Sequence, residues 1–467
     1  MRPMVNPHTT TSSSSDVLRI GCGAGFSGDR WDAAIPVVGT LVAQGGPSAL
    51  IFETLAERTL ALAQLQRRND PATGFEPVLE RFVAPILGDC VRHGIPVIGN
   101  FGAANPRGAA ECLQRLASRL GLPAPRIAVV EGDDLLSGLD NARLRGLLPT
   151  HLAGKALVSA NAYLGAVEIA QALKAGAQIV VTGRVADPSL ALGPMLAHFG
   201  WAEDDWDRLA CGTIAGHLLE CGAQVCGGYF ADPGVKDVPQ LERVGFPIVE
   251  MRADGRFTVT KARGTGGCVD TRTVKEQLLY EIHDPAQYVT PDVIADISEV
   301  EVRRLRADRV EVVGVRGHPL PQTLKATVCF DAGWLAEGEI SYAGANAAGR
   351  GRLAGGIVRD RLRQVGLRHL PVRIDLIGQS SVFADDAGLW PAPFTDDVLA
   401  VHDIRLRVAA RTSSRTDAEA VTREVRAPYT CGTAGGGGVR PQVTSRLSSD
   451  SCHVPRDWIR TGWSFVP

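Results

Sequence analysis

Short apolar runs alternate with amphipathic stretches over the first half of the chain. The runs lie at residues 17–22, 49–52, 96–99, 126–130, 156–160 and 178–182. Strands that alternate with helices of roughly ten to fifteen residues indicate βαβ units, whose strands pair in parallel. We therefore expect an α/β domain over residues 17–232, with a mostly parallel sheet flanked by helices.

The pattern changes after about Pro233. Alternating or β-branched runs predict the strands of an antiparallel sheet at Phe257–Lys261, Val300–Arg304, Val310–Val315 and Thr323–Cys329. The next long amphipathic stretch is Ala345–Val365, which predicts a helix. The expected divisions are a disordered tail over 1–16, the α/β domain over 17–232, a smaller α+β domain over 233–395, and a C-terminal strand with a glycine-rich tail over 396–467.

Composition narrows the class of protein. The 49 Lys and Arg nearly balance the 51 Asp and Glu, so no basic excess points to nucleic acid or an anionic membrane surface. No apolar run is long enough to predict a membrane span. Ten cysteines without a Cys-x-x-Cys motif indicate buried thiols in a reducing compartment. We expect a cytoplasmic enzyme of small-molecule metabolism that forms a homo-oligomer, as such enzymes usually do.

Polar side chains follow the predicted strands of the α/β domain. They are Ser27, Asp29, Arg30, Glu53, Asn100, Asn105, Asp133, Asn161, Arg184 and Asp187. Ligands of open α/β sheets bind outside the carboxyl ends of the strands, where these residues would meet. Asp, Asn and Ser also cap helices at such places, so each of those residues has a purely structural alternative.

The first of these turns carries a glycine motif. Gly23–Gly28 matches G-x-G-x-x-G after a predicted strand, and Glu53 follows the next strand, as in dinucleotide-binding folds. Against this interpretation, Asp29 and Asp32 place negative charge at the start of the helix expected over Asp29–Gln44, where a pyrophosphate would bind.

His217 and Glu220 lie three residues apart in a predicted helix. They therefore share one helix face and could act as an acid–base pair. They could also ligate a metal, but no third ligand is fixed by spacing, and we assign no metal site.

A second glycine-rich turn follows Lys261. The sequence Lys261-Ala262-Arg263-Gly264-Thr265 combines cations with a flexible backbone, so Lys261 and Thr265 could hold an anion. An ordinary β-turn is an equal alternative.

Several of these segments together resemble the acyclic terpene utilisation family, AtuA. The resembling segments are Gly23–Trp31, Glu53–Thr59, Gly99–Pro106, Thr182–Ser189, Gly216–Gln224, Gly264–Asp270 and Lys275–Pro285. The resemblance implies a part in the breakdown of acyclic terpenoids, whose intermediates are branched acyl-CoA thioesters. Cys268 departs from the polar or basic residue expected in its segment.

These observations favour an enzyme that acts on a carboxylic acid or acyl-CoA thioester by lyase or hydratase chemistry. Such chemistry needs a positioned acid and base and a stabiliser for developing charge. We expect Asp29, Glu53 or Asp187 to transfer protons, Arg184 to anchor a substrate oxygen, and His217 and Glu220 to assist. Substrate binding is expected from Ser27, Arg30, Asn100, Asn105, Asp133, Asn161, Lys261 and Thr265.

Two other functions remain open from the sequence. The G-x-G-x-x-G turn leaves an NAD-dependent oxidoreductase possible. The same polar residues would also suit a non-catalytic subunit that only binds a ligand. The sequence assigns no cofactor.

Overall fold

The computed structural model describes residues 16–138, 141–152, 154–382 and 402–467. The expected tail over 1–16 and the expected boundary at 395/396 lie outside these residues, apart from Asp16. The chain divides into two compact units. One comprises Met1–Cys329 with Ser449–Pro467, and the other Phe330–Ser448.

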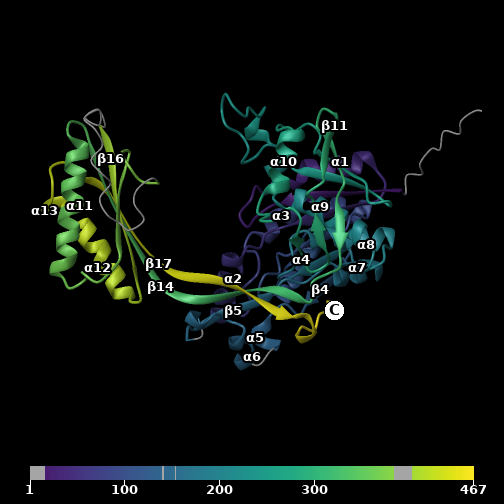
Figure 1. Cartoon of the computed structure of the whole chain (residues 1–467), viewed down its shortest axis with the longest axis horizontal. Helices are drawn as coiled ribbons and strands as arrows, with labels where there is room; N and C mark the ends of the chain where they lie inside the picture. Colours follow the sequence, from purple (N-terminus) through teal and green to yellow (C-terminus); the bar gives the residue numbers. More distant parts are fainter. Residues whose placement is uncertain (1–15, 139–140, 153, 383–401) are drawn as a thin grey trace, which may run out of the picture. The chain divides into compact units, whose positions relative to one another are not determined.

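Five parallel strands form the middle of the first unit's sheet (Figure 1). In spatial order they are β1 (Val17–Ala24), β2 (Ser48–Phe52), β3 (Val97–Gly99), β6 (Ile179–Thr182) and β4 (Ile127–Glu131). Each adjacent pair is parallel. Their side chains are almost entirely buried, as expected for strands covered on both faces. The predicted βαβ core is therefore present.

The sheet as a whole is mixed rather than mostly parallel. Antiparallel strands extend it beyond β1 with β7 (Pro247–Arg252), β8 (Phe257–Lys261), β12 (Arg309–Val313) and β11 (Glu301–Arg306), and beyond β4 with β18 (Gly462–Phe465). A mostly parallel sheet was expected because periodicity along the chain does not say which strand a later segment will join. The strands on both sides of residue 232 thus belong to one sheet and one compact unit.

Helices pack on this sheet in two groups. One group is α1 (Ala34–Gln44), α3 (Leu79–His93) and α4 (Pro106–Arg119), and the other is α7 (Val167–Lys174), α8 (Ser189–Phe199) and α9 (Trp206–Glu220). Right-handed crossovers between the parallel strands place the two groups on opposite faces. Among the described residues, no helix combines the length and apolar character needed to cross a membrane.

Three elements depart from the expected pattern. Helix α1 begins at Ala34 rather than Asp29, because turns occupy the residues between. Strand β5 (Leu157–Ala162) pairs with β14 (Thr323–Ala343) and not with the parallel strands. Helix α10 (Thr271–Leu279) was not predicted, although Asp270 gives it a capping box.

The remaining elements near the site are α2 (Glu57–Asn69), β9 (Tyr288–Val289) and β10 (Ile294–Asp296).

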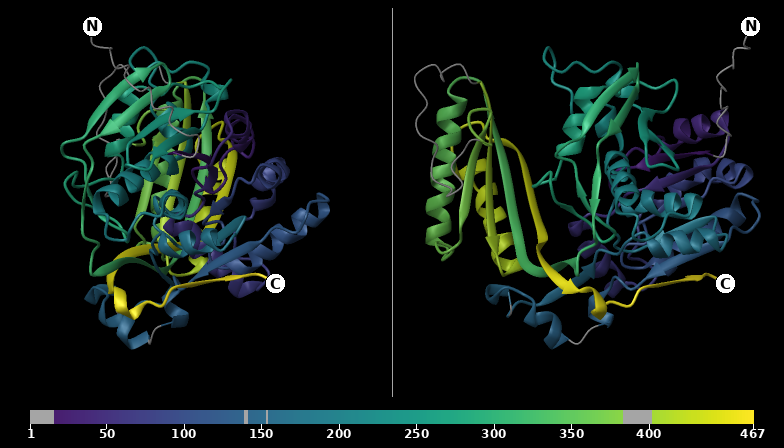
Figure 2. Two further views of the ribbon diagram at one scale, coloured as in Figure 1. Left: turned by 90° about the vertical axis from the view of Figure 1, so that its right-hand side faces the viewer. Right: turned by 45° about the vertical axis from the view of Figure 1, so that its right-hand side comes forward.

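The second unit has a β-α-β-β-α-β order. Its elements are β14, α11 (Ala347–Gln364), β15 (Val372–Ile377), β16 (Asp403–Thr412), α12 (Arg415–Arg426) and β17 (Gly437–Pro455), and the strands lie in the order β15-β16-β14-β17. This is the split βαβ arrangement of ferredoxin-like folds. Both helices lie on one face of the sheet (Figure 2), where side chains such as Ile340, Leu406 and Val421 form the unit's core.

Candidate active site

A cavity of about 760 Å³ opens at the carboxyl ends of β1, β2 and β6. We call it the strand-end cavity. Its walls also include the end of α9, the segment 280–291 and the start of β14, and every lining residue belongs to the first unit. A smaller cavity of about 330 Å³ lies at the other end of the strands, among apolar side chains such as Leu87 and Leu173. The ionisable groups gather in the strand-end cavity, which makes it the candidate active site.

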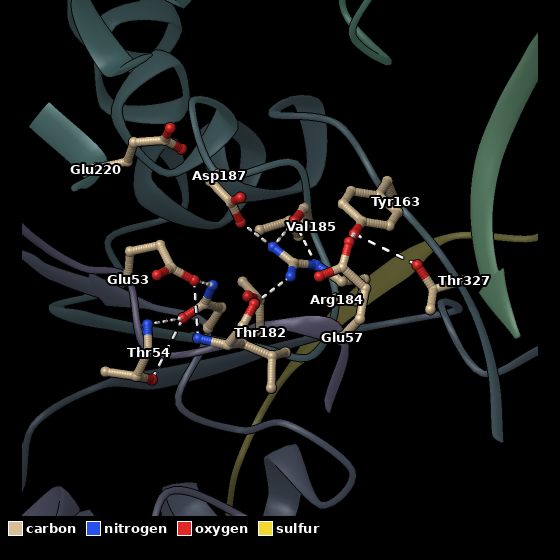
Figure 3. Close-up of polar contacts among 12 residues, drawn as sticks. Glu53, Thr54, Glu57, Tyr163, Thr182, Arg184, Val185, Asp187, Glu220 and Thr327 are labelled. Atoms are coloured by element: carbon tan, nitrogen blue, oxygen red, sulfur yellow. Dashed lines mark hydrogen bonds and ion pairs between the residues drawn. The ribbon is translucent and has the colours of Figure 1, made fainter. Parts of the chain in front are cut away.

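Arg184 lies at the centre of the polar contacts in this cavity (Figure 3). Its side chain is 1% exposed. Nε and Nη2 donate to the carbonyl of Val185 at 2.8 and 2.5 Å, and Nη1 donates to the carbonyl of Leu55. Nη2 also donates to Asp187 Oδ1. Because protein groups occupy most of its N–H groups, Arg184 supplies a fixed positive charge rather than the free substrate anchor that the sequence suggested.

Glu53 and Asp187 are acids in different surroundings. Asp187 contacts the Arg184 guanidinium, and 32% of its side-chain surface is exposed. Within the described residues Glu53 forms no ion pair, and the more distant charge of Arg184 lowers its pKa only in part. Burial, together with the negative charge of Asp187, raises the pKa of Glu53 to about 8. Burial also raises the pKa of Asp187, but Arg184 opposes that effect. The surroundings of Glu53 thus favour its neutral form, whereas the guanidinium contact favours the ionised form of Asp187.

Hydrogen bonds fix where the Glu53 proton resides. Its Oε1 accepts from the Leu55 backbone N–H at 2.8 Å and from Asn100 Nδ2 at 2.9 Å. Asn100 Oδ1 in turn accepts from the Thr54 backbone N–H at 2.7 Å. Because Oε1 already accepts two hydrogen bonds, the proton of neutral Glu53 is expected on Oε2. Oε2 makes no hydrogen bond within the described part of the chain. Asn100 thus orients Glu53, a role different from the substrate contact expected from the sequence.

His217 and Glu220 form a second buried pair at the end of α9. His217 Nδ1 lies 3.2 Å from Glu220 Oε1, and Nε2 lies 2.9 Å from the carbonyl oxygen of Gln277. Burial lowers the pKa of His217 to about 4 and raises the pKa of Glu220 well above its usual value. The helical spacing therefore brings the two side chains together as predicted.

An aromatic residue links Arg184 to the opposite wall. The Arg184 guanidinium lies over the Tyr163 ring at 4.5 Å, and Lys325 Nζ lies 4.8 Å from the same ring. The Tyr163 hydroxyl donates to Glu57 at 2.6 Å, and Lys325 lies 3.4 Å from that carboxylate. The hydrogen bond from Tyr163 and the charge of Lys325 lower the pKa of Glu57 against the effect of its burial.

Asp29 lines the cavity but also shapes the glycine-rich turn. It accepts from the backbone N–H groups of Gly25 at 2.8 Å and Arg30 at 2.7 Å. Gly25 is required because a Cβ there would come within 2.4 Å of the Gly222 nitrogen. The turn thus approaches the end of α9 and bonds a carboxylate, in place of the pyrophosphate that a dinucleotide site would hold.

None of the eight expected substrate-binding residues lines the strand-end cavity. Besides Asn100, which is described above, these are Ser27, Arg30, Asn105, Asp133, Asn161, Lys261 and Thr265. Ser27 bonds Glu76, Arg30 pairs with Asp32, and Asn105 caps α4 by accepting from Gly108 N. Asp133 accepts from the Arg184 backbone N–H and from Asn161 behind the cavity wall. Lys261 donates to the Thr265 carbonyl at 2.8 Å, which closes the second glycine-rich turn on itself.

Sequence reasoning missed the wall that later segments contribute. Tyr163, Glu281, Tyr288, Lys325 and His453 all line the cavity. Glu281 lies within the Lys275–Pro285 segment that carries the family resemblance, so that segment held a usable signal. The others lie in loops or strands whose position depends on tertiary packing. Within the described residues, no group of three His, Cys, Asp or Glu side chains converges as a metal site would require.

Comparison with known proteins supports the family resemblance. Residues 18–465 match the model of the acyclic terpene utilisation family protein AtuA. No curated protein matches the chain. The family match covers nearly the whole chain and includes every segment named in the sequence analysis, so the prediction is confirmed. The chain belongs to the AtuA family, which is named for acyclic terpene utilisation.

Proposed function

We propose that the chain is a lyase or hydratase that acts on an acyl thioester in the strand-end cavity. The observation that carries the proposal is the contrast between two neighbouring acids. Asp187 contacts Arg184, whereas Glu53 accepts hydrogen bonds from two N–H groups and has a pKa of about 8. Paired carboxyl groups held in opposite protonation states are what general acid–base catalysis uses.

The two acids would divide the proton transfers of an elimination. Asp187 takes the proton from the carbon next to the thioester carbonyl, and the electron pair forms a carbon–carbon double bond. The bond to the β-hydroxyl breaks as Glu53 Oε2 gives its proton to the departing oxygen, which leaves as water. Hydration is the reverse and starts from the opposite protonation states: ionised Glu53 takes a proton from the attacking water, and protonated Asp187 gives its proton to the carbon next to the thioester carbonyl.

Charge in the cavity favours a thioester over a free acid. The carboxylates of Asp29, Glu57, Asp187 and Glu281 line the cavity, and Arg184 is already bound by protein groups. A free carboxylate brought among them would be repelled, whereas the acyl end of a thioester is uncharged. Apolar side chains such as Leu55, Leu324 and Val289 offer contacts for a hydrocarbon chain, and the family description suggests a branched, terpene-like one.

Turnover of a small enoyl thioester tests this function. We expect the protein to hydrate 3-methylcrotonyl-CoA, measured as loss of the enoyl absorbance. Glu53→Gln and Asp187→Asn should each lower the rate by about 10²- to 10⁴-fold, because each removes one proton-transfer group. Glu111→Gln is the matched control, since this carboxylate is 59% exposed and lies on α4 away from the cavity. Its rate should equal that of the wild type.

The contrary results separate the alternatives. Thioester binding without turnover would indicate a non-catalytic binding subunit. Tight binding of NAD(H) by the purified protein would favour the oxidoreductase instead. Full activity in both the Glu53 and Asp187 variants would show that the chemistry lies elsewhere.

A further inference from the structure

The hydrogen bond of His217 to a carbonyl fixes its tautomer. The Gln277 carbonyl oxygen, 2.9 Å from Nε2, can only accept a hydrogen bond. Nε2 must therefore carry a hydrogen. In the neutral imidazole, Nδ1 then has a lone pair and no hydrogen.

The tautomer in turn fixes the state of Glu220. A hydrogen bond across the 3.2 Å between Nδ1 and Oε1 requires one proton between the two groups. Both side chains are buried, with His217 2% and Glu220 7% exposed. Besides the Gln277 carbonyl on His217, the pair has only the weak thiol donor of Cys221, whose Sγ lies 3.8 Å from Glu220 Oε1, within the described part of the chain. Burial therefore favours the neutral pair over the ion pair, so Glu220 Oε1 carries the hydrogen and donates it to His217.

This leaves the second carboxyl oxygen of Glu220 as a bare acceptor. Oε2 is buried and makes no hydrogen bond within the described part of the chain, although Glu220 lines the strand-end cavity. A buried acceptor without a partner costs free energy, which a bound molecule with a suitable donor would recover. Oε2 has no hydrogen to offer, so it would repel a carboxylate or phosphate oxygen of the substrate.

We infer that Glu220, held as a neutral acid by His217, accepts a hydrogen bond from a hydroxyl group of the bound acyl substrate. Oε2 itself is a neutral acceptor, and a hydroxyl is the donor that the acyl part of a thioester can present to it. The inference rests on the proposed function and deepens it, because it assigns a hydroxyacyl thioester as the substrate class. In the hydration direction, the same acceptor would hold the attacking water.

Binding of a matched ligand pair tests this inference. The probes are 3-hydroxy-3-methylbutyryl-CoA and 3-methylbutyryl-CoA, measured by calorimetry on the full chain. Wild-type protein should bind the hydroxylated thioester about tenfold more tightly. Glu220→Gln should keep this preference, because its amide donates to His217 Nδ1 and its carbonyl replaces Oε2. Glu220→Leu should lose the preference and still bind 3-methylbutyryl-CoA, which also shows that the variant is folded.

Results that would overturn this inference can be told apart from results that would overturn the proposed function. Equal affinity of the wild type for the two thioesters would overturn the inference and leave the proposed function standing. Loss of the preference in Glu220→Gln would show that Glu220 acts as a charged group, which also overturns it. A protein that binds neither thioester would overturn the proposed function and the inference together. Infrared difference spectra of wild type and Glu220→Gln give an independent check, since an ionised Glu220 at neutral pH contradicts the inference without any ligand.

Discussion

Three carboxyl groups in the strand-end cavity have different surroundings because each contacts different partners. Asp187 contacts a guanidinium, Glu53 accepts two N–H groups, and Glu220 faces an imidazole. The sequence identified all three as candidates but could not rank them, because the partners come from distant segments. Their surroundings favour one ionised and two neutral acids, which is a division of roles rather than a uniform acidic site.

Glu53 should make the protein less stable at alkaline pH. Its pKa is about 8 in the folded protein and about 4.5 when unfolded, so folding takes up a proton between these values. Its contribution to stability is therefore present below pH 4.5 and is lost as pH rises through 8. Glu53→Gln, which keeps the acceptor for Asn100, should raise the melting temperature by roughly 2–5 °C at pH 9 and have little effect at pH 5. Equal melting curves for both proteins at pH 9 would contradict the assignment.

His217 should have the opposite dependence. Burial lowers its pKa from 6.5 to about 4, so its contribution to stability is present above pH 6.5 and is lost as pH falls toward 4. The free energy of unfolding of wild type should fall more steeply over this window than that of His217→Gln, by on the order of 1–3 kcal/mol. Chemical denaturation at several pH values measures the difference, and parallel curves for the two proteins would count against a neutral His217.

At the scale of elements, the sequence predicted the features that depend on residues close together in the chain. The parallel strands, most of their helices and the glycine-rich turn after β1 were predicted from periodicity and spacing. The positions of β5, β7 and β18 were not, because strand pairing depends on segments far apart in sequence. The residues of the candidate site were predicted to the same extent. Residues at the strand ends were expected, whereas Tyr288, Lys325 and His453 reach the cavity from segments later in the chain.

Asn105 stabilises helix α4 and does not line the strand-end cavity. Its Oδ1 caps α4, and its Nδ2 donates to the carbonyls of Pro71 and Thr73. Asn105→Ala should cost about 1–2 kcal/mol of stability, measured by chemical denaturation, and leave turnover per folded molecule unchanged. Asn105→Asp keeps the cap oxygen and should lose less. A large loss of turnover with unchanged stability in the alanine variant would return Asn105 to the substrate site expected from the sequence.

At the scale of the whole molecule, the candidate site belongs to one of the two units. All residues that line the strand-end cavity lie in Met1–Cys329 and Ser449–Pro467. The second unit has its own core beneath α11 and α12. Cytoplasmic location and assembly into a homo-oligomer stay predictions, and light scattering of the purified protein would determine the oligomeric state.

Removal of the second unit should leave the first unit folded. The chain enters the second unit through β14 and leaves it through β17, and these two strands are neighbours in the unit's sheet. A short Gly-Ser linker in place of residues 330–448 can therefore join Cys329 to Ser449. We expect the shortened chain to unfold cooperatively in calorimetry and to bind the same thioesters. An unfolded or aggregated product would show that the cavity depends on the second unit.

The most direct test of the central claim is the titration of Glu53 itself. Infrared difference spectra between wild type and Glu53→Gln, recorded from pH 5 to 10, isolate this carboxyl group without needing a substrate. We predict a protonated carboxyl signal that disappears with a midpoint near pH 8. A Glu53 that is already ionised at pH 6 would contradict its role as the general acid.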